Sequence, residues 1–430
     1  MPRPTRLLGP LLTPFLVLTL LPITGCSSEA NGGTGADGGA DAELSVMANI
    51  TDKSSMDSVV AAFRREHPGI EVTLTFADTN TLQKRLPRQL RSGKGPDVFT
   101  VWPGSGNPAS VTALAADDLL EELSLRHFNL DLPEGVRPVT VAEDGGTYAV
   151  PVNFSAIGAI YSTAALEAVD ATPPTTWTEL LTLCDTARGH GKVLFALGNE
   201  TPWVRQLITY ALVATTVYAG RPEFDEQMEF GRTTFAGSEW RTALLKYLEM
   251  EERGCFNSDP LHTGYEDTLD EVTSGRALGV VQVASTLSAL RAADPDLDLR
   301  MAALPATDDP GDTRMPGAVS AAYGLNPGSP HREAALAFID FLGSEQGQNL
   351  YNRSGATLPA IPNSSFAVDA AIEEVAERQQ SGTTVPFMDQ RWPNTAVQQV
   401  HFEQIRSLFA GTTDVDSALA ALDRAYREGE

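Results

Sequence analysis

The sequence predicts an α/β fold made of two lobes, each a doubly wound sheet flanked by helices. Strand-like and helix-like patterns alternate between residues 43 and 102, as they do where helices join parallel strands. The alternation restarts after residues 147–162. About 390 of the 430 residues follow a polar N-terminal stretch, which is enough chain for two domains. Ligands of such sheets bind beyond the carboxyl ends of the strands.

The first 25 residues predict an export signal. Arg3 and Arg6 precede a leucine-rich run at 7–23, and small residues lead from this run to Cys26. The tetrapeptide "ITGC" resembles a bacterial lipobox, in which the cysteine thiol takes a lipid through a thioether bond. Three prolines in the run and the lack of a basic flank disfavour the alternative, a single membrane-spanning anchor. We therefore expect a signal peptide at 1–25, lipidation of Cys26, and an extracellular protein anchored at the outer face of the cytoplasmic membrane.

Residues 26–43 predict a flexible leash, because Gly, Ser, Ala and acidic residues dominate this stretch and little in it is apolar. The whole chain has 56 acidic and 31 basic residues, a formal charge of −25. This balance excludes nucleic acid as an expected partner, since no basic stripe is available to neutralise phosphates. It also disfavours direct docking of the folded region on anionic lipid. A neutral ligand suits the composition best.

The first half of the folded region predicts three strands joined by two helices. Alternating apolar residues mark the strands, and apolar residues spaced by three or four mark the helices. Pro68 and Gly69 end the first helix, and Pro87 bends the second. The expected elements are a strand at 43–49, a helix around 56–63, a strand at 70–76, a helix around 82–90 and a buried strand at 96–102.

The second half repeats the alternation with longer helices. Thr176 stands three residues before Glu179, the spacing of a capping box. Ser329 and Pro330 have the residue types of a helix cap and a first helical position. The expected elements are a helix at 175–188, strands at 193–197 and 277–284, and helices at 329–342 and 414–429.

Only Cys184 and Cys255 remain beyond Cys26. An even pair outside the cell often forms a disulfide, and two buried free thiols are the alternative.

Motifs for catalysis and for metal binding are missing from the sequence. The six histidines are scattered, and none of their spacings is that of a metal site. Ser105 stands in "GSG", which lacks the five-residue pattern of a serine hydrolase. We therefore expect a binding protein that has no catalytic residues, no cofactor and no metal. Since the chain has many acids, two carboxylates could still meet across a cleft, so a hydrolase stays as an alternative.

Six segments, in this order and behind a lipobox, carry a family resemblance. They are "VAAFRREHPGIEVTLTF" (60–76), "RSGKGPDVFTVW" (91–102), "YAVPVNFSAIGAIYS" (148–162), "PPTTWTELL" (173–181), "FNSDPLHTGYEDTLDEVTSGRALGVV" (256–281) and "GLNPGSPHREAALAFIDFLGSEQGQ" (324–348). The series resembles family 1 extracellular solute-binding proteins, the relatives of maltose-binding protein that supply ABC importers. The resemblance covers residues 44–430.

The resemblance implies a periplasmic-binding-protein clamshell whose chain crosses between the lobes three times, near Asn153, Gly317 and Pro359. Lobe one would comprise 44–152 and 318–358, and lobe two 153–317 and 359–430. Such a protein captures its ligand by hinge closure. Its expected partners are a saccharide and the permease subunits of an ABC importer, and we expect it to act as a monomer.

Sugars stack their C–H faces on aromatic rings, so the five tryptophans are the first candidates for ligand contacts. By resemblance, Trp102, Trp203 and Trp392 are expected to stack on the ligand. Trp177 and Trp240 are expected to pack in the core.

Several polar side chains complete the expected site. By resemblance, Glu200 accompanies Trp203. Asn153 and Ser155 lie on the first crossing, Asp52 and Lys53 follow the first strand, and Gln282 follows the "ALGVV" strand, with Ser285 as a further candidate. The family often has an aromatic ring near Gln282, and its absence here suggests a different pocket. Asp97 is expected to brace a turn.

Three hypotheses follow, and they differ in the ligand and in the chemistry. The leading one is a lipid-anchored protein that delivers a saccharide, expected to be an oligosaccharide, to an ABC importer. The second keeps the fold with another solute, such as a polyamine, a phosphate ester or a peptide. The third is a surface glycan hydrolase, which would need two carboxylates on either side of the bound sugar.

Overall fold

The computed structural model describes residues 42–428. The predicted signal peptide, the predicted lipidation site Cys26 and the rest of the predicted leash as far as residue 41 lie outside this range. The first strand begins at Ala42, so the leash prediction was two residues too long. Within the described range, no helix has the length and apolar character needed to span a membrane.

The first sheet has five strands in the order β2-β1-β3-β10-β4. Strands β1, β2 and β3 are parallel, and β10 runs antiparallel between β3 and β4. Leu44, Val46 and Ala48 are buried, as their alternation predicts. The strands are β1 (Ala42–Asn49), β2 (Ile70–Ala77), β3 (Val98–Val101), β4 (Val150–Pro151) and β10 (Ala322–Leu325).

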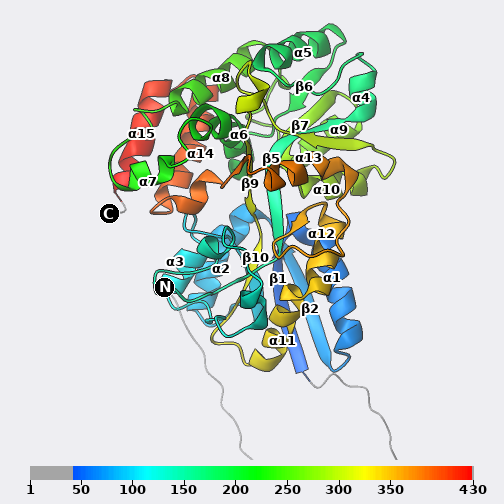
Figure 1. Ribbon diagram of the computed structural model, residues 1–430, viewed down its shortest axis with the longest axis vertical. Helices are drawn as coiled ribbons and strands as arrows, with labels where there is room; N and C mark the ends of the chain where they lie inside the picture. Colours follow the sequence, from blue (N-terminus) through cyan, green and yellow to red (C-terminus); the bar gives the residue numbers. More distant parts are fainter. Residues whose placement is uncertain (1–41, 429–430) are drawn as a thin grey trace, which may run out of the picture. The chain divides into compact units, whose positions relative to one another are not determined.

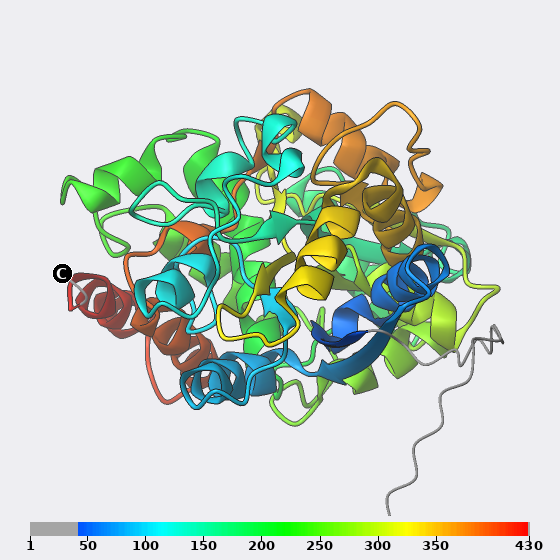
Figure 2. The same ribbon diagram turned by 90° about the horizontal axis from the view of Figure 1, so that it is seen from below.

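Helices flank this first sheet, and we call the sheet and these helices lobe one (Figure 1). They are α1 (Lys53–Glu66), α2 (Thr79–Arg91), α3 (Val111–Ala116), α11 (Arg332–Gly343) and α12 (Glu345–Gly355). Helices α1 and α12 lie side by side although they are far apart in sequence (Figure 2). The Ser55 hydroxyl donates a hydrogen bond of 2.7 Å to the main-chain oxygen of Tyr351, which ties the two helices together.

The second sheet is built around the long strand β5, which is antiparallel to four of its neighbours. Its strands are β5 (Asn153–Ser162), β6 (Val193–Ala196), β7 (Ala277–Val283), β8 (Leu299–Ala302), β9 (Met315–Val319), β11 (Leu358–Pro359) and β12 (Thr384–Val385). Together with its helices it forms lobe two. The fold is therefore the predicted one, two mixed sheets flanked by helices.

Among the described residues, seven α-helices of lobe two contribute buried residues to one large apolar core: α4 (Thr163–Glu167), α5 (Trp177–Gly189), α6 (Arg205–Val213), α7 (Phe224–Glu229), α8 (Trp240–Glu252), α14 (Ala396–Phe409) and α15 (Val415–Arg427). A second apolar cluster takes its buried helical residues from α9 (Tyr265–Thr273), α10 (Thr286–Ala293) and α13 (Glu373–Gln380), among others. The predicted capping box is present at Thr176 and Glu179. A disulfide joins Cys184 of α5 to Cys255, which decides between the two alternatives for these cysteines.

The chain passes between the two sheets three times, and these passages are hydrogen-bonded to one another. The Asn153 side chain accepts hydrogen bonds from the main-chain N–H groups of Ser320 (3.3 Å) and Ala321 (2.9 Å). Asn352, near the end of α12, donates to the main-chain oxygen of Val152 at 2.8 Å. The second passage falls at Ser320, after the predicted Gly317, because Gly317 still pairs with β5.

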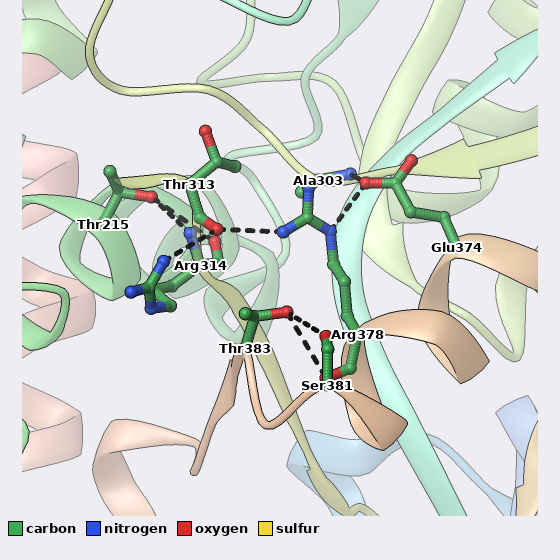
Figure 3. A network of polar contacts seen from close by, with 8 residues as sticks. All are labelled: Thr215, Ala303, Thr313, Arg314, Glu374, Arg378, Ser381 and Thr383. Carbon is green, nitrogen blue, oxygen red and sulfur yellow. Dashed lines mark hydrogen bonds and ion pairs between the residues drawn. The ribbon is translucent and has the colours of Figure 1, made fainter. Parts of the chain in front are cut away.

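A polar network in lobe two holds the start of β9, the strand that leads into the second passage (Figure 3). The N–H group of Arg314 donates to the Thr215 hydroxyl oxygen at 3.0 Å. Arg378 donates to the main-chain oxygen of Thr313 at 2.9 Å and forms an ion pair with Glu374. These contacts attach the start of β9 to α13, and the strand leads from there into the second passage.

One predicted helix start was wrong. Helix α11 begins at Arg332, so Ser329 does not cap it. The Ser329 hydroxyl instead donates to the Asp97 carboxylate at 2.5 Å, and Ser45 donates to the same carboxylate from β1. Asp97 thus braces a turn, as predicted.

Candidate ligand-binding site

A pocket lies between the two lobes, beside the passages of the chain. In this structure the cavity has a volume of about 100 Å³, which is smaller than the roughly 300–1,000 Å³ of most small-molecule sites. We call it the central pocket. Ser320 and Ala321, in the second passage, form part of its lining, and the rest comes from both lobes. A ligand here would contact both lobes and the hinge region.

Lobe one contributes residues at the carboxyl ends of its strands, where ligands of such sheets bind. Asn49 ends β1, and its N–H group donates to the Thr100 hydroxyl of β3 at 3.1 Å. Its side-chain amide donates to Thr79 at 2.9 Å, at the start of α2. Trp102 follows β3 and is half-buried, so part of its ring stays available to a ligand. Asp52 comes from the 3-10 turn η1 (Ile50–Asp52).

Lobe two contributes two short segments to the opposite wall. Trp203, in the turn η4 (Pro202–Val204), and Tyr210, in α6, bring aromatic rings to the pocket. Asp389 and Gln390, in the turn η8 (Met388–Arg391), bring polar groups. Aromatic planes and polar groups therefore come from both lobes.

Each lobe places one buried carboxylate in the central pocket. Burial raises the pKa of Asp52 to about 6, and the hydroxyl groups of Tyr351, Thr51 and Tyr323 beside it only partly offset this effect. Burial likewise raises the pKa of Asp389 to about 6. Asp389 accepts a hydrogen bond of 2.7 Å from the side-chain amide of Gln398.

Two further spaces adjoin the central pocket. The acidic mouth is lined by Asp78, Glu200 and Glu266 together with Tyr265, and it shares Trp203 with the central pocket. The rings of Trp203 and Tyr265 lie 5.1 Å apart between centroids.

The basic groove lies on the other side of Gln83, which lines both it and the central pocket. It is lined by Lys84, Arg88 and Arg91, with Asp117 paired to Arg91. The cleft therefore has two branches of opposite charge: the acidic mouth is negative and the basic groove is positive.

The two lobes make close main-chain contact beside the pocket. The N–H group of Ser105 donates to the main-chain oxygen of Gln390 at 3.2 Å. A Cβ atom on Gly104 would lie 2.2 Å from the same oxygen, and one on Gly106 would lie 2.0 Å from the main-chain oxygen of Asp389. The glycines of the "GSG" segment therefore permit this approach, a role that the sequence analysis did not assign to them.

Of the predicted ligand contacts, Asp52, Trp102 and Trp203 line the central pocket, and so does the further candidate Ser285. Glu200 lines the acidic mouth instead. The structure thus brings these residues to one cleft, and their ligand contacts stay predictions.

Two predicted contacts are placed elsewhere and are corrected here. Trp392 is 3% exposed and packs edge-on against Tyr210 and Phe235 in the core of lobe two, so its ring is not available for stacking. Lys53 is exposed, forms an ion pair with Asp57 and lies outside the central pocket. Trp177 and Trp240 are buried, as predicted.

Gln282 faces away from the central pocket, which also corrects its predicted role. It pairs with Gly158 on β5, whereas its neighbour Val283 pairs with Ile157. Paired residues share a face of the sheet, and Ile157 and Val283 line the pocket, so Gln282 lies on the opposite face.

Asn153 and Ser155 are buried outside the pocket lining. The side chain of Asn153 is engaged by the second passage, so its role is to hold the hinge region. Ser155 lies two residues further along β5 and is fully buried. Neither is placed to contact a ligand in this structure.

Sequence reasoning missed most of the polar lining of the pocket. Asp389 and Gln390 precede Trp392 in "DQRWPN", a segment of which only Trp392 is a predicted ligand contact. Tyr210 and Gln206 lie on α6, a helix whose other residues are largely apolar. A tyrosine and a glutamine one turn apart on such a helix were the available signal.

A family model described as bacterial extracellular solute-binding protein matches residues 48–349. The melibiose/raffinose/stachyose-binding protein MelE of Bacillus subtilis (strain 168) is 23% identical to the chain over 244 residues, which is 55% of this chain and 55% of MelE. The chain therefore aligns with about half the length of this curated relative.

Solved structures resemble this one over most of the chain. The binding protein RafE in complex with raffinose has a TM-score of 0.74 at 16% identity, and the match covers 90% of this chain and 99% of RafE. The GacH receptor of Streptomyces glaucescens, solved unliganded and with acarbose, has a TM-score of 0.73 at 18% identity, covering 90% and 98%. At these identities the likeness concerns the fold.

Proposed function

The chain belongs to the bacterial extracellular solute-binding proteins, and on that premise we propose that it binds an oligosaccharide in the central pocket and delivers it to an ABC importer. Capture occurs when the lobes close on the ligand around the three passages. The relatives described above support this proposal, since MelE, RafE and GacH are named for, or solved with, saccharides.

The observation that carries the proposal is the composition of the central pocket. Trp102 from lobe one faces a wall that holds Trp203 and Tyr210 from lobe two. Aromatic planes suit the C–H faces of sugar rings, and the amide, hydroxyl and carboxylate groups between them suit sugar hydroxyls. A ligand that contacts both walls stabilises the closed form, because its contacts are complete only there.

The site of action follows from the N-terminal sequence. We propose that Cys26 carries the lipid and that the leash keeps the two lobes near the permease at the outer face of the membrane. The protein works as a monomer in this proposal.

A thermal-shift screen against mono- and oligosaccharides tests the function. A saccharide at 100 times its dissociation constant stabilises the native state by about 2.7 kcal/mol, so its melting temperature rises. Trp203→Ala should remove this rise, whereas Phe230→Ala, a change at a ring that is 64% exposed, should leave it unchanged. If no saccharide raises the melting temperature, the proposed function is wrong.

The hydrolase alternative has one observation in its favour, since Asp52 and Asp389 bring two carboxylates to one pocket. Glycosidases separate the pKa values of their two acids, so that one donates a proton while the other stays ionised. Here burial raises the pKa of both acids, so their surroundings shift the two pKa values in the same direction. Incubation with oligosaccharides followed by chromatography decides the matter: a binding protein returns them intact.

A further inference from the structure

The central pocket and the acidic mouth carry five carboxylates and no basic side chain. Asp52 and Asp389 line the pocket, and Asp78, Glu200 and Glu266 line the mouth. Among the described residues that line these two spaces, none is Lys, Arg or His. A cleft lined by one sign of charge concentrates ligands of the opposite sign.

In the lobe-two wall, the hydrogen bonds leave two buried amide oxygens without a donor from within residues 42–428. Gln398 uses its amide N–H to donate to Asp389, and Gln390 uses its own to donate to the main-chain oxygen of Val319 at 2.7 Å. Both amides are at least nine-tenths buried, and neither side-chain oxygen has a hydrogen-bond partner among the described residues. The amide orientations are fixed by chemistry, because only the nitrogen can donate to a carboxylate or a carbonyl.

This acceptor set distinguishes between two kinds of ligand group. A sugar hydroxyl both donates and accepts, whereas an ammonium group only donates and carries a positive charge. Asp389 and the amide oxygens of Gln390 and Gln398 therefore match an ammonium group in both respects. The ring of Tyr210, which lines the same wall, can add a cation–π contact.

Charge balance favours the same group. A carboxylate buried without a positive partner is costly, and a ligand cation that reaches it removes much of that cost. Asp52 contributes a second such carboxylate from lobe one, so a cation between them is attracted by both lobes. The basic groove beyond Gln83 repels the same cation. The charged end of the ligand should therefore lie away from this groove.

Building on the proposed function, we propose that the ligand is a saccharide with a protonated amine, and that Asp389, Gln390 and Gln398 hold its ammonium group opposite Asp52. Amino sugars have this chemistry. The amine lies in the central pocket, and the remaining sugar units extend away from the basic groove toward the acidic mouth.

Isothermal titration calorimetry at pH 6.5, where most of the sugar amine is protonated, tests this proposal with a matched pair of probes. The probes are the β-1,4-linked trisaccharide of glucosamine and its fully N-acetylated counterpart, which differ in the charge on nitrogen. A hydrogen bond to a charged group contributes about 1.5–3 kcal/mol, so the amine form should bind at least ~10-fold more tightly than the acetylated form. Raffinose and maltotriose serve as neutral references, and spermidine as an amine without sugar.

The variant Asp389→Asn keeps the shape of the side chain and removes its charge. It should weaken binding of the glucosamine trisaccharide by about tenfold or more and change the affinity for the acetylated form by less than about twofold. Asp296→Asn, at an exposed position, is the matched control and should change neither affinity. An unchanged melting temperature of the unliganded variant, or a raised one, excludes misfolding as the cause.

The outcomes separate this inference from the proposed function. If a neutral or acetylated saccharide binds as tightly as the amine form, or if Asp389→Asn affects both forms equally, the amine proposal is wrong and saccharide binding stands. If no saccharide binds, with or without an amine, the proposed function itself fails. Binding of spermidine in the absence of any saccharide binding would replace both proposals with a polyamine carrier.

Discussion

The hydroxyl group of Ser105 donates a hydrogen bond of 2.5 Å to the main-chain oxygen of Trp392. This bond joins a loop of lobe one to the segment of lobe two that carries Asp389 and Gln390. Two polar residues of the pocket are therefore held in place by contact between the lobes. In the proposed mechanism, closure of the lobes would therefore also assemble the binding site.

Gly106→Ala tests this link. A methyl group at this position would collide with the main-chain oxygen of Asp389, 2.0 Å away, so the lobes cannot approach as closely. We expect ligand affinity to fall about tenfold or more while the melting temperature of the unliganded protein changes little. Gly135→Ala, where nothing lies within 4 Å, is the control. Equal affinities of Gly106→Ala and wild type would show that the contact does not matter for binding.

The two buried carboxylates predict a stability that depends on pH. Burial raises the pKa of Asp52 and of Asp389 from 3.8 to about 6. The folded state then binds these protons more tightly than the unfolded state, so stability is lost as the pH rises from 4 to 6. The loss is on the order of 3 kcal/mol for each carboxylate at most.

The comparison should use the double variant Asp52→Asn/Asp389→Asn, because other groups titrate in the same range. Burial lowers the pKa of His401 to about 3, which destabilises the folded state on acidification, in the opposite direction. Urea unfolding at pH 4 and at pH 7 should show the variant gaining stability relative to wild type as the pH rises. A difference that stays constant with pH would contradict the proposed burial.

Trp392→Ala should destabilise the unliganded protein. The indole is 3% exposed and contacts Tyr210, Phe235 and Trp240, so its removal leaves a cavity in the core. Truncation of a buried tryptophan costs about 3–5 kcal/mol, which urea unfolding measures. Trp102→Ala, at a half-buried position in the pocket, should cost much less. Similar losses for the two variants would argue against this assignment.

The disulfide between Cys184 and Cys255 should contribute strongly to the stability of lobe two. The two cysteines are 71 residues apart, and closing a loop of that length stabilises a protein by about 4 kcal/mol through the entropy of the unfolded chain. The double variant Cys184→Ala/Cys255→Ala should therefore unfold at lower urea concentration. Wild-type protein with the disulfide reduced should match it. An unchanged midpoint would mean that the bond adds nothing to the native state.

The fold could be predicted because its signals are local and periodic. Alternation at 43–49 and 70–76 and the capping box at Thr176 specify their elements without reference to the rest of the chain. The site was harder, because it depends on which face each residue occupies after folding. Gln282 and Val283 are neighbours in sequence, and only the register with β5 shows that Val283 faces the pocket.

Trp392 illustrates the same limit. An aromatic residue beside polar ones suits a ligand contact as well as it suits the edge of a core. The helices α6, α8 and α14 close over its ring, whereas Asp389 and Gln390 just before it face the cleft. No local pattern in the sequence separates these three residues, since the difference arises from packing between distant segments.

The most direct test of the account is calorimetric titration of one bound oligosaccharide into wild type, Trp102→Ala and Trp203→Ala. These rings stand in the same pocket on opposite lobes, so a ligand held between the lobes needs both. We predict that each variant weakens binding about tenfold or more, while its unliganded melting temperature stays near that of wild type. Unchanged affinity in either variant would contradict the account, because the ligand would then bind without contact to that lobe's ring.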